Sequence, residues 1–184
     1  VDAEAVMAQA LPTEAQMQMS PLLFLFAAGL QSVLLGGLLG LLISFGEEYG
    51  WRGYLQRELV KLGRVRGILL LGVIWGLWHA PVIWMGHNYP GYPVWGTLLM
   101  VLYSTGLAFV LGYAVLKTGS VLLAAFLHAV NNQVYSFLSV LVYQPDNPIF
   151  SFGAGIYGIL TLGLVVLLLL RDPVWRQPGV AGEH

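Results

Sequence analysis

The chain has 184 residues, a formal net charge of −1, 58% hydrophobic residues and only 9% charged residues. A soluble domain carries about 25% charged residues, so this composition excludes an ordinary soluble protein, and the near-neutral charge gives no reason to expect nucleic acid as a partner. Cysteine is absent, which excludes disulfides, thiol nucleophiles and thiolate metal sites.

The N-terminal segment 1–20 is polar and acidic and lacks the basic region of a signal peptide. Because the chain begins with Val1 rather than methionine, we expect further membrane spans upstream of it. A membrane-spanning helix needs about 20 apolar residues, and five segments are long enough: 21–46, 67–85, 94–116, 121–143 and 151–170. We therefore predict an all-α, polytopic transmembrane bundle, divided into a polar segment 1–20, a core 21–170 and a cytoplasmic tail 171–184.

The basic residues predict the orientation of this bundle. The connection 52–66 carries Arg52, Arg57, Lys61, Arg64 and Arg66, whereas the connection 86–93 carries no Lys or Arg. The positive-inside rule then places 52–66 and the C-terminus on the cytoplasmic side of the plasma membrane. Two interpretations of 52–66 remain open, a helical extension lying in the membrane interface and a solvated basic loop.

Two adjacent carboxylates, Glu47 and Glu48, end the first apolar segment. An ionisable group at such a depth costs roughly 2.5–3.5 kcal/mol, so it indicates a functional site. Glu48 and Arg52 are four residues apart and share a helical face, which predicts an ion pair. Glu47 lies on another face and is then free to act as a base. The alternative is that both carboxylates face the cytoplasmic interface and pair with basic neighbours.

Three further polar side chains lie within the predicted spans. His79 is in the second span, where a single histidine is often a hydrogen-bonded core residue. His128 and Asn132 are four apart in the fourth span, so both project from one face and both can donate to one oxygen. Hydrogen bonding between helices is the structural alternative for this pair.

Together these groups suit the hydrolysis of an amide. A carboxylate and a histidine can activate water, and two donors opposite them can stabilise the tetrahedral oxyanion. No Asp lies in any predicted span, and neither a His-Glu-x-x-His nor a Gly-x-Ser-x-Gly motif is present. The residues that aspartyl proteases use are therefore missing from the spans, and so are the usual motifs of zinc metalloproteases and of serine hydrolases.

The same residues carry a family resemblance. Glu47-Glu48-x-x-x-Arg52, Trp75-x-x-x-His79 and His128-x-x-x-Asn132 resemble, in order and spacing, the three motifs of the CAAX protease and bacteriocin-processing family, which contains the type II CAAX prenyl endopeptidases. The resemblance covers about residues 40–135. The second motif of the family is usually written with Phe where this chain has Trp75.

The resemblance implies a glutamate-dependent intramembrane endopeptidase that needs no metal. By this resemblance Glu47 and His79 would activate water, and His128 and Asn132 would form the oxyanion hole. Glu48 would also belong to the catalytic site, and Arg52 and Trp75 would support it structurally. Its substrate would be a membrane-associated peptide or protein, prenylated where the host makes such chains. A zinc ion held by Glu47, His79 and His128 is the alternative cofactor assignment.

Two functions of other classes stay open: a non-catalytic membrane protein for bacteriocin immunity or scaffolding, and a transport pathway with Glu47 as a proton site. For Glu47 to meet His79 and His128 at one depth, the first helix must continue through 49–60 and the second must begin before Arg66. We predict both, together with a water-filled cavity open to the cytoplasm. His87 and His184 have no evident partner in the sequence.

Overall fold

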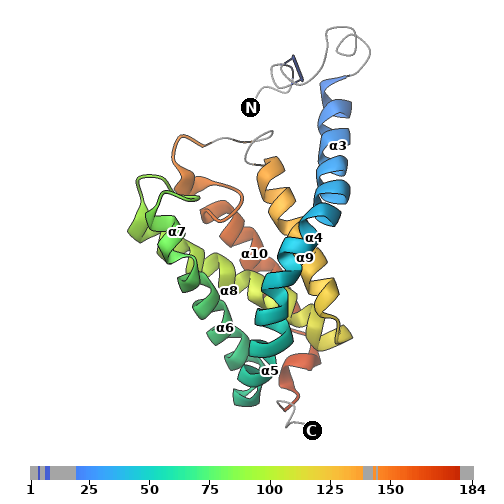
Figure 1. The fold of residues 1–184 in the computed structure, drawn as a ribbon, viewed down its shortest axis with the longest axis vertical. Coiled ribbons are helices and arrows are strands. Elements are labelled where there is room, and N and C mark those ends of the chain that lie inside the picture. Colours follow the sequence, from blue (N-terminus) through green and yellow to red (C-terminus); the bar gives the residue numbers. More distant parts are fainter. Residues whose placement is uncertain (1–3, 5–6, 9–19, 139–142, 144, 179–184) are drawn as a thin grey trace.

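The computed structural model describes residues 4, 7–8, 20–138, 143 and 145–178, and its regular elements are helices (Figure 1). Most of the predicted segment 1–20 therefore lies outside the described residues. The helices form a bundle in which the loop after α7 and the segment before α10 lie at one end. The turn after α5 and the last described residues lie at the opposite end.

The first helical stretch runs without a break from Pro21 to Leu62, over 42 residues. Its hydrogen-bonding pattern changes along the way: α3 (Pro21–Gln31), π-helical η1 (Ser32–Gly36), α4 (Gly37–Glu48), π-helical η2 (Tyr49–Leu55), α5 (Gln56–Leu59) and 3₁₀ η3 (Val60–Leu62). Gly63 ends it with φ 102°, a backbone conformation that side chains disfavour. The predicted continuation through 49–60 is confirmed, and 52–62 is helix rather than loop.

Helices occupy all five predicted apolar segments, with different bounds. After the first stretch come α6 (Arg64–Trp78), α7 (Ala80–Trp84), α8 (Pro93–Thr118), α9 (Val121–Phe137), η5 (Pro148–Phe150), α10 (Ile156–Leu169) and η6 (Pro173–Arg176). The second helix begins before Arg66, as predicted. Gly119 ends α8 in the left-handed conformation at φ 71°, and the Ser120 hydroxyl caps α9 by accepting from Leu123 N.

Three predicted spans compare differently with the structure. The predicted span 67–85 corresponds to Arg64–Trp84, which is one apolar stretch long enough to cross a bilayer. It is divided into α6 and α7 at His79, because Pro81 lacks an N–H and its ring would collide with the carbonyl four residues earlier. The span 151–170 begins only at Ile156, since the glycine-rich residues before it are poor helix formers. Helix α9 runs to Phe137 and Leu138 is still helical, but positions 139–142 of the predicted fourth span lie outside the described residues, so the end of that span stays a prediction.

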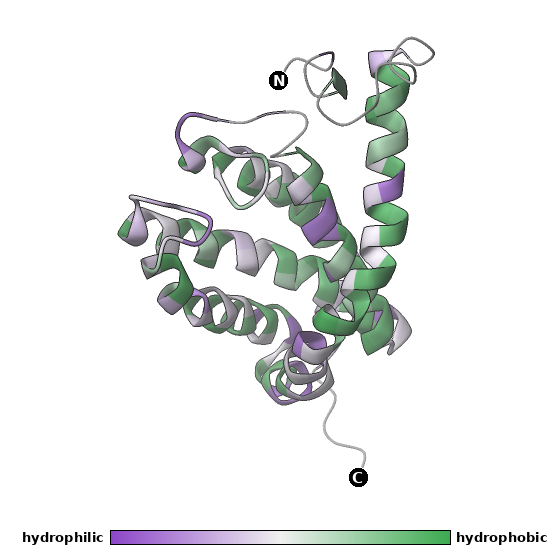
Figure 2. Ribbon diagram, turned by 45° about the horizontal axis from the view of Figure 1, so that its top comes forward, coloured by the Kyte–Doolittle hydropathy of each residue, from purple (hydrophilic) through white to green (hydrophobic). Residues whose placement is uncertain are grey.

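The outside of the bundle is apolar. Three helices, Pro21–Leu62, Arg64–Trp84 and Pro93–Thr118, are long and apolar enough to cross a bilayer, and α10 is a shorter apolar helix. Leu42 and Leu39 are 83% and 78% exposed, and Figure 2 shows hydrophobic residues along most of the helices. Soluble proteins rarely expose such continuous apolar surface. The chain is a multi-pass membrane protein.

Small residues set the helix packing. Added Cβ atoms at Gly72 and Gly76 of α6 would fall on the α8 backbone at Thr105 and Val101, so these two helices touch through their main chains. On the other side α4 packs against α9, and a Cβ at Gly40 would lie 3.4 Å from the Cβ of Ala129. Small residues allow such close approach between membrane helices. The result places the ends of α4 and α6 beside the middle of α9.

The residues after α10 pack against the bundle. Val174 and Trp175 are buried in the main core beside α6 and α8. Arg64 Nη1 donates to the carbonyl of Val174 at 2.9 Å, and Lys117 Nζ lies 3.1 Å from a carboxylate oxygen of Asp172. Residues 172–175 of the predicted tail therefore pack against the bundle.

Candidate active site

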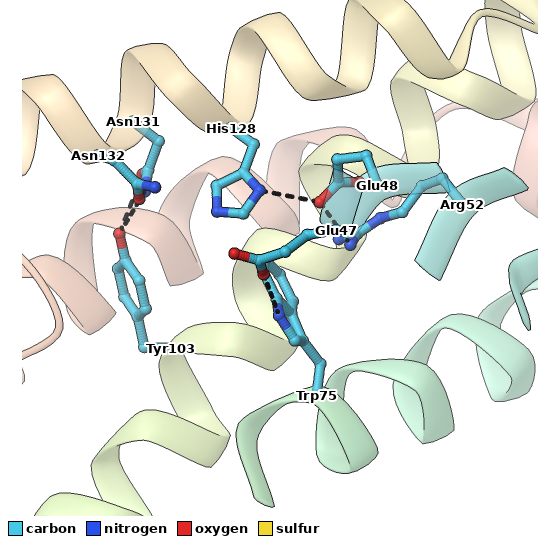
Figure 3. A network of polar contacts seen from close by, with 8 residues as sticks. All are labelled: Glu47, Glu48, Arg52, Trp75, Tyr103, His128, Asn131 and Asn132. Carbon is cyan, nitrogen blue, oxygen red and sulfur yellow. Dashed lines mark hydrogen bonds and ion pairs between the residues drawn. The ribbon is translucent and has the colours of Figure 1, made fainter. Parts of the chain in front are cut away.

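A buried ion cluster lies where α4, η2 and α9 meet. Arg52 Nη1 donates to Glu48 Oε1 at 3.0 Å, and His128 Nδ1 lies 3.0 Å from the same oxygen. The three side chains are 0%, 0% and 6% exposed. The predicted Glu48–Arg52 pair is thus confirmed, and His128 is its third member. Figure 3 shows this row of contacts.

The contact with Glu48 determines how His128 can act. An ionised carboxylate only accepts hydrogen bonds, so His128 Nδ1 carries the hydrogen that Glu48 receives. Nε2 is then the ring nitrogen left for other partners. On a neutral ring Nε2 accepts, and on a doubly protonated ring it donates. Donation to an oxyanion therefore requires the imidazolium form, with Glu48 as its counter-ion.

Trp75 lies at the centre of the site. Its Nε1 donates to Glu47 Oε2 at 3.4 Å, and its ring lies 4.5 Å below the Arg52 guanidinium carbon. The ring also meets His128 edge-on, with 5.2 Å between ring centroids. Trp75 therefore contacts two turns of the first helical stretch, at Glu47 and at Arg52, and joins both to α6.

His79 sits at the break between α6 and α7. Its backbone N–H donates to Gly76 O at 3.2 Å rather than to the carbonyl four residues back. The freed carbonyl of Trp75 lies 2.8 Å from His79 Nδ1. Since a carbonyl only accepts, His79 carries its hydrogen on Nδ1 and leaves Nε2 for another partner. The irregular helix end thus orients the ring.

Five of the predicted site residues line one cavity of about 360 Å³: Glu47, Trp75, His79, His128 and Asn132. Glu48 and Arg52 lie behind its wall, in contact with His128 and Trp75. The cavity is deep at Trp75 and Leu107, which are 2% and 4% exposed, and it opens where Asn132 and Ser136 are exposed. Groups from three separate helices are therefore brought together.

The two asparagines have different roles in the structure. The Tyr103 hydroxyl lies 2.8 Å from Nδ2 and 3.0 Å from Oδ1 of Asn131, so this pair joins α8 to α9. Asn131 Nδ2 also donates to Asn132 Oδ1 at 3.4 Å. The Asn132 amide thus uses its oxygen locally and leaves its NH₂ group for the cavity, on the same helical face as His128.

Sequence reasoning missed several lining residues. Tyr103 and Ser104 of α8 are an unremarkable part of an apolar helix in the sequence, and Tyr135 is one turn beyond the third motif. His87 had no evident partner, yet it lines the cavity together with Asn88, because the loop after α7 folds back through a 3.0 Å hydrogen bond from His87 N to Val82 O. Only the fold brings this loop to the site.

The zinc alternative requires three donors around one point. Within the described part of the chain, no group of three or more His, Cys, Asp or Glu side chains is placed to hold a metal ion. Glu47, His79 and His128 line the same cavity but are not arranged as such a group.

The cavity and the basic residues lie at opposite ends of the bundle. The lining of the cavity includes His87 and Asn88, in the loop that follows α7. The exposed basic residues lie in α5 and η3, in the first turn of α6, at the end of α8 and around η6, at the other end (Figure 1). Glu47 also lines another cavity of about 460 Å³ together with Trp51, Tyr54 and Leu55, nearer the basic end. The side of the membrane to which the site opens stays a prediction.

Comparison with known proteins agrees with the motifs. A family model described as type II CAAX prenyl endopeptidase Rce1-like matches residues 20–134, which include the whole buried cluster. The chain belongs to this family. It is also 28% identical over 106 residues to a CAAX prenyl protease 2 of Methanococcus maripaludis, across 54% of this chain and 39% of that protein. The chain thus spans well under half of that relative's length. No solved structure matches it.

Proposed function

We propose that the protein is an intramembrane endopeptidase that hydrolyses a peptide bond of a membrane-associated peptide or protein without a metal ion. The observation that carries the proposal is the convergence of Glu47, His79, His128 and Asn132 on one cavity inside a membrane bundle. Membership of the Rce1-like family and the likeness to a CAAX prenyl protease support it.

Glu47 and His79 activate the water in this proposal. A water molecule between the Glu47 carboxylate and His79 Nε2 gives a proton to Glu47 while its oxygen attacks the carbonyl carbon of the substrate. Glu47 then passes the proton to the departing amine as the C–N bond breaks, so no covalent enzyme intermediate forms. General acid–base assistance of this kind contributes about 10²–10⁴-fold to the rate.

His128 and Asn132 bind the oxyanion. Nε2–H of a doubly protonated His128 and the free NH₂ of Asn132 are the two donors on one helical face. Glu48 holds the His128 ring through Nδ1 and balances its charge, and Arg52 balances Glu48. Loss of one such donor costs about 10²–10³ in kcat.

The proposed orientation follows the charges. We place the basic end of the bundle in the cytoplasm, according to the positive-inside rule. The loop with His87 and Asn88 then lies towards the opposite side of the membrane. We keep the expected opening of the site towards the cytoplasm, where Glu47 lines another cavity with Trp51 and Tyr54.

The test is cleavage of a tail peptide by the full chain in proteoliposomes, with prenylated and unprenylated peptides as separate arms. Wild type should cleave, and His79→Ala and His128→Ala should lose at least about 10²-fold in kcat. Glu58→Gln is the matched control, because Glu58 pairs with Lys61 on the surface and should leave the rate unchanged. Equal cleavage by all variants contradicts the proposal, and loss on chelation with recovery on added zinc contradicts its metal independence.

A further inference from the structure

A further cavity, of about 330 Å³, lies at the end of the bundle that carries the segment before α10 (Figure 1). It shares no lining residue with the candidate active site. Its volume is at the lower end of the roughly 300–1,000 Å³ of small-molecule pockets. The lining consists of Tyr143, Pro145, Asp146, Asn147, Phe150 and Tyr157. A cavity of this size can hold a small ligand or the head group of a larger one.

Three aromatic rings form much of the wall. Tyr157, in the first turn of α10, has its ring centroid 6.3 Å from that of Tyr143 and 6.1 Å from that of Phe150. The ring planes meet at 55° and 46°, so the rings are inclined to one another rather than stacked. Phe152 does not line the cavity, but its ring contacts both tyrosine rings, at 5.6 and 5.4 Å, and holds them in place. Inclined rings around one space form an aromatic cage.

Asp146 adds an exposed carboxylate to this cage. The eight Lys and Arg residues of the chain lie elsewhere, in η2, α5, η3 and α6, at the end of α8 and around η6. Within the described part of the chain, no salt bridge involves Asp146. The cavity therefore combines a negative charge, not neutralised by a basic side chain, with aromatic rings. Both attract a cation.

The loop that carries the carboxylate is held by local hydrogen bonds. Asn147 Oδ1 accepts from Ile149 N at 3.0 Å, and Phe150 N donates to Asn147 O at 3.0 Å. Pro145 and Pro148 each restrict the backbone φ to about −65°. Because the loop is already ordered, little conformational entropy remains to be lost when a ligand binds.

The lining also selects between kinds of cation. A primary ammonium carries three N–H donors that each need an acceptor, whereas these walls are largely aromatic and the Asn147 side-chain oxygen already accepts from Ile149 N. A fully methylated ammonium has no N–H group to satisfy, and aromatic faces attract its charge. We propose that the cavity binds a trimethylammonium group, carried by a phosphatidylcholine head group or by a small solute such as choline. This proposal does not depend on the proposed endopeptidase function.

The first test is a ligand-observed NMR titration of choline against the full chain in maltoside micelles. Two probes serve as controls: ethanolamine, and the uncharged choline analogue in which carbon replaces the ammonium nitrogen. Choline should bind at least about tenfold more tightly than either probe, because only choline combines the charge with a methylated surface. Equal binding of choline and its uncharged analogue is the result expected from an ordinary aromatic belt at the membrane interface, and it overturns the proposal.

The second test removes the parts of the cage one at a time. Tyr157→Leu loses a ring and should weaken choline binding at least about fivefold, whereas Tyr157→Phe keeps the ring and should stay within about twofold of wild type. Asp146→Asn changes only an exposed loop side chain and should also weaken binding. Trp95→Leu is the matched control, because Trp95 is 63% exposed and lies outside the cage. Equal choline binding by Tyr157→Leu, Asp146→Asn and wild type overturns the proposal.

A third measurement distinguishes the two sources of the trimethylammonium group. The full chain is extracted from vesicles of equal parts phosphatidylcholine and phosphatidylglycerol, and its retained lipids are weighed by native mass spectrometry. Enrichment of phosphatidylcholine on wild type but not on Tyr157→Leu assigns the cage to the lipid head group. Choline binding without such enrichment assigns it to a small solute. Absence of both signals overturns the proposal.

Discussion

His128 Nδ1 lies 3.0 Å from Glu48 Oε1, although 80 residues separate them in the chain. The same carboxylate oxygen accepts from Arg52, so one glutamate joins the helix of the first motif to the helix of the third. This contact makes Glu48 a positioning residue: it orients the His128 ring and supplies the negative charge that a doubly protonated ring needs.

Replacement of this carboxylate should destabilise the protein. Glu48→Gln leaves the buried Arg52 without its counter-ion, and removal of one partner of a buried pair costs about 3–5 kcal/mol. The measurement is denaturant unfolding in detergent, followed by tryptophan fluorescence. Glu58→Gln removes a pair whose side chains are about half exposed and should cost less than about 1 kcal/mol. Similar losses for both variants would contradict the buried cluster.

The Trp75 ring should matter more than its N–H group. Trp75→Phe removes a long, 3.4 Å hydrogen bond to Glu47 but keeps an aromatic ring below Arg52 and against His128. We expect kcat to fall by less than tenfold. Trp75→Ala also leaves a cavity in the core and should lower the unfolding free energy by about 3–5 kcal/mol. An equal loss of stability in both variants would show that the ring packing is unimportant.

Close contact between α6 and α8 should make Gly72 intolerant of a side chain. A Cβ there would fall on the Thr105 backbone, so Gly72→Ala must push the helices apart and unfold or loosen the site. Gly163 of α10 has no neighbouring atom within 4 Å of the added Cβ, so Gly163→Ala is the control. It should be neutral or stabilising by up to about 1 kcal/mol. The thermal midpoints of the two purified variants check this.

The C-terminal segment should loosen in acid. A hydrogen bond from Val174 N, and further ones from the Tyr113 hydroxyl and Lys117, lower the pKa of Asp172 below its usual 3.8. A lowered folded-state pKa stabilises the fold above the unfolded-state value, and this stabilisation is lost as the pH falls through the folded-state pKa. Asp172→Asn should flatten the loss of thermal stability below about pH 4. Asp146→Asn should keep the wild-type profile.

The orientation can be tested directly, because the chain contains no cysteine. We introduce single cysteines by Arg57→Cys at the basic end and Asp146→Cys at the other end, both at exposed positions. A membrane-impermeant maleimide should label Asp146→Cys in intact cells. It should label Arg57→Cys only after the cell membrane is permeabilised. The reverse pattern would contradict the proposed orientation.

Local signals predicted much of this structure, and long-range contacts account for the rest. Apolar length indicated the five helical segments, and four-residue spacing predicted the Glu48–Arg52 pair and the shared face of His128 and Asn132. Spacing cannot show which turn of α9 faces α4, so the His128–Glu48 contact was not predicted. His87 lies beside the site only because its loop folds back onto the bundle.

The most direct test of the central claim is the initial cleavage rate of a tail peptide by wild type and Glu47→Gln, with peptide binding measured alongside. Because Glu47 lines the cavity and pairs only weakly with Trp75, Glu47→Gln should still fold and bind the peptide. We predict that its kcat falls by about 10²–10⁴-fold at unchanged binding. An unchanged rate would contradict the role of Glu47 as the base.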